Sequence, residues 1–183
     1  MIYPQHFEQK IGFTEIRQLL MGHCLSTLGR NRVEQMTFLT RVEEIRILHQ
    51  QTTEFRRIMA EDTELPEQDF YDLRPTIHRI RIEGVHFDEK ELYNLYLSLR
   101  TLHSWIEILR TEEEGEQPAY PALHKLTEGV FTFHAVTKRA EQILDRYGRI
   151  RDDATPELAS IRHELRRQEG SVSRTLNKIL KAA

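Results

Sequence analysis

The sequence has 183 residues, of which 39% are hydrophobic and 30% are charged, and its formal net charge is −3. This length suits one domain, or one domain with an extended arm, and the apolar content is sufficient for a core, which argues against disorder. A pI near 6.3 argues against a dedicated basic nucleic-acid-binding module.

The chain carries no sign of a disulfide, a secretory signal or a membrane span. Its single cysteine, Cys24, cannot form an internal disulfide, and its place between Leu20 and Leu25 favours a small core residue. The first residues have neither a basic region nor a long apolar run, and no later stretch is long enough to cross a bilayer. We therefore expect a cytoplasmic protein that does not contact a membrane.

Helical spacing of apolar residues dominates the first 60 residues. Thr14 is predicted to cap a helix that ends at Gly22, and Ser26 is predicted to cap another over residues 27–36. The run 40–43 reads as a capping box that opens a helix to about residue 60.

The next part of the chain is predicted to alternate loops with helices. The acidic stretch 61–69 is expected to be a loop, and a helix through Ile77, Ile80 and Ile82 is expected to break at Gly84. A second capping box at 88–91 opens the clearest helix of this half, whose apolar stripe runs from Leu92 to Leu109.

A polar linker and two more helices are predicted before residue 150. The linker covers residues 112–117, and the helices cover 122–126 and 135–147. The β-branched stretch 129–133 allows at most one short extended piece. The fold class that follows is all-α, with a multi-helical core segment over residues 1–154 and a separate helix over 155–183.

The last helix differs in kind from the others. Thr155-Pro156 places a capping residue before a proline at the first helical position, and no stop signal follows. We expect this helix to continue beyond residue 183. Its apolar positions form a narrow heptad-like seam, weakened at Gln168 and Thr175, that needs a partner helix. The seam residues are Leu158, Ile161, Leu165, Val172 and Ile179.

No reactive constellation is found, so we expect no catalytic, cofactor-binding or metal-binding residues. The sequence lacks GxxxxGK[ST], GxSxG, HExxH and CxxC patterns, and no two of its nine histidines are four residues apart. Asp152 and Asp153 are interpreted as acids placed before a helix N-terminus, where negative charge is favoured.

Positive charge collects in the last quarter of the chain. Residues 138–183 hold 11 Lys and Arg against 7 Asp and Glu, whereas residues 1–137 hold 15 against 22. The candidate contact residues on the last helix are Arg162, Arg166, Arg167, Arg174 and Lys178. They are expected to contact phosphates, to flank the seam facing a partner helix, or to form ion pairs on a solvated helix face.

Three runs resemble the MutS family of ATPases. The first is residues 145–162, where a glycine, a basic–aliphatic–acidic turn and Ala154-Thr155-Pro156-Glu157-Leu158 precede a helix. The family usually has serine at the position of Thr155. The others are the start, from Phe7 through the run 24–30, and the run 70–75 followed by Gly84.

The resemblance covers nearly the whole chain and implies the N-terminal core-to-lever region of the second MutS paralogue. The absence of a mismatch-reading domain before Phe7 is expected of that branch, whose members carry a C-terminal Smr nuclease domain. It implies a dimeric ATPase that uses ATP and Mg²⁺ and clamps nucleic acid, either branched DNA in recombination control or the ribosomal RNA of collided ribosomes. Neither the ATPase motifs nor the Smr motifs occur in these residues.

The leading hypothesis is therefore a non-catalytic core and lever segment that couples a clamp to an ATPase located elsewhere. The alternative is a free-standing helical protein–protein interaction module. The seam can be covered if the last helix folds back on the core of its own chain or pairs with the same helix of another copy. We predict the second, a homodimer or higher self-association through residues 156–183.

Overall fold

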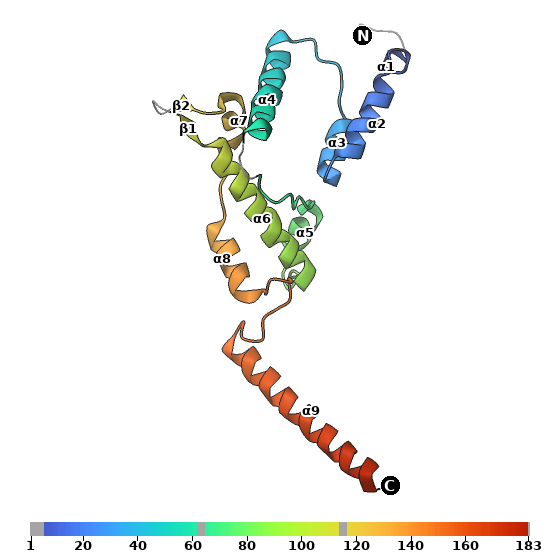
Figure 1. Ribbon diagram of the computed structural model, residues 1–183, viewed down its shortest axis with the longest axis vertical. Coiled ribbons are helices and arrows are strands. Elements are labelled where there is room, and N and C mark those ends of the chain that lie inside the picture. The colour runs from blue at the N-terminus through green and yellow to red at the C-terminus, as the bar shows by residue number, and fades with distance from the viewer. Residues whose placement is uncertain (1–5, 62–64, 114–116, 183) are drawn as a thin grey trace.

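The computed structural model describes residues 6–61, 65–113 and 117–182 of the chain, and over these residues the fold is all-α, as predicted (Figure 1). The helices, in chain order, are α1 (Phe7–Lys10), α2 (Phe13–His23), α3 (Thr27–Glu34), α4 (Val42–Ala60), α5 (Arg74–Arg79), α6 (Glu89–Leu109), α7 (Pro121–His124), the 3₁₀ helix η1 (Lys125–Thr127), α8 (His134–Ile143) and α9 (Pro156–Ala182). The strands β1 (Glu112–Glu113) and β2 (Gln117–Pro118) form a short antiparallel pair.

Two of the four predicted helix caps in the first half are confirmed. The Asp88 carboxylate accepts the Glu91 N–H at 2.7 Å while Glu91 accepts the Asp88 N–H, which is the reciprocal capping box of α6. The Ser26 hydroxyl accepts the Gly29 N–H at 3.1 Å and caps α3.

The other two caps are wrong. Gly12, in a left-handed conformation, precedes α2, so Thr14 lies inside the helix, and α2 continues through Gly22 to His23. α4 begins after Arg41, which makes no side-chain cap, so Thr40 lies one residue too early to bond the first turn.

Predicted boundaries also shift in the second half. α5 ends at Arg79, before Ile82, and α8 ends at Ile143, four residues earlier than expected, because the following chain forms a tight turn around Asp145. The expected linker at 112–117 contributes to the β1–β2 pair; its residues 114–116 lie outside the described residues. The stretch 129–133 forms no strand.

The main core lies where α4, α6 and α7 meet. Ile58 of α4 is fully buried and packs with Ala119, Tyr120 and Leu123. Trp105 of α6 covers this cluster and stacks on Phe55, with ring centroids 5.6 Å apart. A small apolar cluster thus holds one end of α6 against α4.

A buried carboxylate joins α4 to α7. Glu54 accepts the backbone N–H groups of Ala122 and Leu123 at 2.9 and 2.8 Å, where the unpaired N–H groups of a helix N-terminus favour negative charge. Arg57, one turn later, donates to the Ala119 carbonyl at 2.6 Å and lies over the Tyr120 ring. The chain turn before α7 is therefore fixed by polar groups of α4.

The first three helices form their own small unit around Arg17. This side chain pairs with Glu8 at 2.9 Å and donates to the carbonyls of Val33 and Met36, at 2.7 and 3.0 Å. In Figure 1 the unit, in blue, stands beside α4 and is joined to it by the chain between α3 and α4.

α9 follows the turn after α8, near the N-terminal end of α6, and extends away from the other helices (Figure 1). The chain exposes 14,928 Å², whereas a compact folded protein of this mass exposes roughly 9,300 Å². The excess reflects the projecting helix and many exposed apolar side chains. Within the described residues, none of the helices has both the length and the apolar character that crossing a membrane requires.

Candidate lever junction and partner surface

The chain between α8 and α9 folds into a tight turn organised by one carboxylate. Asp145 accepts the N–H groups of Tyr147 and Arg149 through the same oxygen, at 2.8 and 2.9 Å. Its own backbone bonds Arg149 and Gly148, at 2.8 and 3.0 Å. The hydrogen bond from the Arg149 N–H is the main cause that holds the pKa of the Asp145 carboxyl below its usual range. The Tyr147 N–H and the guanidinium groups of Arg149 and Arg146 lower this pKa further.

The turn is fixed to the first two turns of α6. Gly148 has φ +77° and lies so close to Tyr93 that an added Cβ would come within 2.4 Å of the ring. Tyr93 donates its hydroxyl to the Arg146 carbonyl at 3.3 Å, and Glu89 accepts the Ile150 N–H at 2.5 Å. Glycine is needed here both for the left-handed backbone and for this close approach.

A second carboxylate connects the turn to the body of α9. Asp152 pairs with both Arg162 and Arg166, which lie on one face of the helix, and Arg162 also donates to the Ile150 carbonyl at 3.2 Å. Asp153 pairs instead with Arg151 at 3.0 Å, and this bond holds its pKa below the usual range. The two acids therefore act as acceptors for specific arginines, which the interpretation from the helix N-terminus alone had not included.

We call this arrangement the lever junction and define it as residues 145–155 with Glu89, Tyr93, Arg162 and Arg166. Its last residue, Thr155, accepts the Leu158 N–H at 3.2 Å, which confirms the predicted cap of α9. The chain from α8 into α9 is thus bonded to α6 or to α9 at successive positions.

The predicted contact residues on α9 are mostly engaged within the chain. Besides the two arginines on Asp152, Arg167 pairs with Glu164 at 2.9 Å and Arg174 donates to the Gly170 carbonyl at 3.0 Å. The side chain of Lys178 lies outside the described residues. Arg162, Arg166 and Arg167 therefore each form an ion pair within the chain.

The predicted seam forms an exposed apolar stripe. Ile161, Leu165 and Val172 are 61, 51 and 59% exposed, whereas Leu158 near the junction is half-buried. The side chain of Ile179 lies outside the described residues.

The stripe also includes Leu176 and Leu180, which the heptad assignment missed. Because a straight helix has 3.6 residues per turn, residues spaced strictly seven apart move gradually away from one face of the helix. Counting at 3.6 would have found both leucines.

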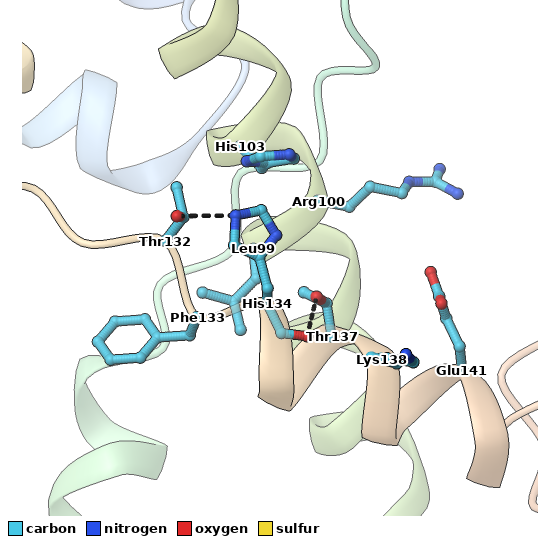
Figure 2. Close-up of a pocket in the computed structure, with 9 residues that line it drawn as sticks. All are labelled: Leu99, Arg100, His103, Thr132, Phe133, His134, Thr137, Lys138 and Glu141. Carbon is cyan, nitrogen blue, oxygen red and sulfur yellow. Dashed lines mark hydrogen bonds between the residues drawn. The ribbon is translucent and has the colours of Figure 1, made fainter.

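An open pocket of about 360 Å³ lies between α6 and α8 (Figure 2). The rings of His103 and His134 meet edge to face there, 4.3 Å apart, and Thr132 bonds His134 at 3.0 Å. Among the described residues, no three histidine, cysteine or acidic side chains gather to hold a metal ion. None of the residues that line this pocket belongs to the lever junction.

Acid is expected to loosen the turn only below the ordinary titration range of aspartate. Because the pKa of Asp145 is lowered on folding, its stabilising effect is fully present above the unfolded pKa of about 3.9 and is lost as pH falls through the lower folded value. Amide exchange at Tyr147 and Arg149, followed by NMR, should accelerate only in that acidic window. Asp145→Asn, which keeps an acceptor oxygen but cannot titrate, should show no such step; an identical step in that variant would contradict the assignment.

Comparison with known proteins agrees with the resemblance found in the sequence. The chain is 27% identical over 173 residues to the Endonuclease MutS2 of Halalkalibacterium halodurans, covering 93% of the chain and 22% of that protein. It is 25% identical to the protein of that name from Shouchella clausii, over 98% of the chain and 23% of the relative.

A third relative, the Endonuclease MutS2 of Symbiobacterium thermophilum, is 30% identical over 157 residues, which are 84% of the chain and 19% of that protein. The chain thus spans about a fifth of the length of these relatives. No protein-family model matches it.

Proposed function

Because the chain is a relative of the MutS2 proteins of the MutS family, we propose that it is a non-catalytic core and lever segment of a MutS-like, nucleic-acid-clamping ATPase. In this proposal α4–α8 form part of the core, and α9 is the lever that carries movement to a clamp. ATP and Mg²⁺ would bind elsewhere in the longer protein. The nucleic acid would be branched DNA or ribosomal RNA.

The observation that carries this proposal is the lever junction. A lever transmits motion only if its root is stiff, and here Gly148, Ile150 and Asp152 are each held by a partner on α6 or α9. α9 has 27 residues, hence a length of about 40 Å. A rotation of about 10° at the junction would move its tip by about 7 Å.

The proposal predicts that a flexible insertion at the root of α9 uncouples the two ends of the longer protein. Two glycines inserted after Asp153 separate the Asp145 turn from the helix without replacing any side chain. ATP hydrolysis without nucleic acid should be unchanged, and its response to nucleic acid should be lost. Steady-state hydrolysis assays with and without DNA and RNA measure both.

The matched control is the same insertion after Gly84, in the exposed turn between α5 and α6. This insertion should leave the response intact. A response that survives the insertion after Asp153 would contradict the lever role.

We further propose that the apolar stripe of α9 packs against another helix, and that in this chain alone a second copy fulfils that role. Burying each Leu, Ile or Val stabilises by about 1.5–3 kcal/mol, and the stripe holds five such exposed residues in the described part of α9. Two identical helices can bury the same stripe around a two-fold axis.

The wild-type chain is therefore predicted to dimerise, and Leu165→Glu/Val172→Glu to be monomeric, in sedimentation experiments at matched concentrations. Ser160→Glu/His163→Glu adds two acids on roughly the opposite face and should leave the dimer intact. A wild-type chain that stays monomeric at high concentration would contradict self-association through α9.

A further inference from the structure

The turn within the lever junction has basic and aromatic side chains that are exposed to solvent. Tyr147 is 66% exposed, and the guanidinium of Arg146 lies 4.7 Å from the centre of its ring. Arg149, two residues on, is also exposed. Three successive side-chain positions, interrupted only by Gly148, thus offer two positive charges and one aromatic face to solvent.

These two arginines differ from Arg162, Arg166 and Arg167 of α9 in having no carboxylate at ion-pair distance within the described part of the chain. Asp145, the acid closest in sequence, is occupied by two backbone N–H groups. On the Arg146 side, a cavity of about 370 Å³ contains Glu67, paired with Arg100, and Glu141, which accepts the Tyr96 hydroxyl.

The acids on the Arg149 side are also occupied. Glu89 accepts the Ile150 N–H, Asp152 pairs with two arginines of α9, and Asp153 pairs with Arg151. Among the described arginines of residues 145–166, Arg146 and Arg149 are therefore the two without a direct ionic partner.

The turn is also pre-organised. Its backbone is fixed by Asp145 and by the contact of Gly148 with Tyr93, so a ligand that binds the exposed side chains does not have to order the chain. The side chains of Arg146, Tyr147 and Arg149 have no part in these bonds, because only their backbone groups are used.

We propose that the turn of residues 146–149 binds single-stranded nucleic acid, with phosphates on Arg146 and Arg149 and an unpaired base stacked on Tyr147. Guanidinium groups bind phosphate oxygens through paired N–H donors, and an exposed ring stacks on any base that is free of its own helix. A duplex offers phosphates but no open base face, which is why a single strand is the better fit. This function goes beyond the lever role, which needs only the backbone of the turn.

The test is fluorescence anisotropy of the 183-residue chain with labelled 15-nucleotide oligo(dT), oligo(U) and a DNA duplex, over a range of salt. The chain should bind both single strands more tightly than the duplex. Arg146→Ala/Arg149→Ala should weaken binding at least tenfold and reduce the slope of log affinity against log salt by about 1.4. Tyr147→Leu should weaken it about fivefold or more, and Tyr147→Phe should bind like wild type.

The matched control is Arg167→Ala/Arg174→Ala, which removes the same charge from two positions of α9 outside the lever junction and should change affinity by less than about threefold. Circular dichroism of each variant should match wild type. Equal affinity for DNA and RNA strands is expected, since neither contact reads the sugar. The proposal is overturned if Arg146→Ala/Arg149→Ala binds like wild type, or if the control variant loses more affinity than Arg146→Ala/Arg149→Ala does. It is also overturned if the wild-type chain binds no single strand at low salt.

Such a failure would leave the lever role standing, because the insertion after Asp153 tests coupling without reference to this turn. Conversely, a response to nucleic acid that survives the insertion after Asp153, together with intact strand binding, would retain the contact and reject the lever.

Discussion

Replacing Gly148 with alanine is expected to destabilise the chain by about 2–4 kcal/mol, because two costs act at one position. A side chain at φ +77° is strained, and the new methyl group would lie within 2.9 Å of three atoms of the Tyr93 ring. Relief requires the turn to move off α6. Urea denaturation, followed by far-ultraviolet circular dichroism, measures the free energy of unfolding.

The chain offers a matched control for the first of these costs. Gly84 has φ +81° but nothing within 4 Å of an added Cβ, so Gly84→Ala should cost only about 1 kcal/mol. Adding Tyr93→Ala to Gly148→Ala removes the clash, and the double variant should be less destabilised than the sum of the two single variants. Equal effects of alanine at positions 84 and 148 would show that the Tyr93 contact contributes nothing.

Replacing Glu54 with glutamine is expected to cost about 2–3 kcal/mol. Glutamine has nearly the same shape, but it has one acceptor oxygen, and whichever way its amide is turned its NH₂ group would face the Ala122 N–H, which both carboxylate oxygens of Glu54 accept. It also removes the negative charge at the start of α7. The free energy of unfolding reports the loss, and exchange of the Ala122 and Leu123 amides should accelerate.

Glu83→Gln, at an exposed position of the turn after α5, serves as the control and should change stability by less than about 0.5 kcal/mol. If Glu54→Gln were no more destabilising than this control, the bonds to α7 would not stabilise the fold.

The parts of the fold that could be predicted are those encoded within a few residues. The capping box of α6 and the Thr155-Pro156 start of α9 each lie within one helical turn, and both are confirmed. Thr14 failed because glycine in a left-handed conformation can begin a helix without any capping side chain, as Gly12 does.

The junction could not be predicted because its bonds join residues far apart in the chain. Glu89 meets Ile150 across 61 positions, and Glu54 meets Ala122 across 68. A pattern of charges does not show which acid lies beside which amide. For the same reason the arginines of α9 looked available in the sequence, although Asp152, ten residues before Arg162, engages two of them.

The partner of the exposed apolar stripe of α9 could not be predicted from the sequence either. Periodicity shows which residues of α9 share a face, but the partner that covers the face is not a property of the helix itself. The exposed stripe of α9 is therefore interpreted as an interface, in keeping with a chain that spans about a fifth of its relatives' length.

If the lever junction fixes the direction of α9 relative to α6, the distance between spin labels on the two helices has a single narrow distribution, and this distance is the most direct measurement of that stiffness. With Cys24 replaced by serine, labels at Leu102→Cys and Ser173→Cys lie on exposed positions of α6 and α9. The labelled chain is diluted with unlabelled chain so that distances between copies do not contribute. Pulsed dipolar spectroscopy should give one narrow distance distribution, which Glu89→Ala/Asp152→Ala broadens without loss of helix content. A distribution as broad in the labelled parent chain as in that variant would contradict a stiff junction.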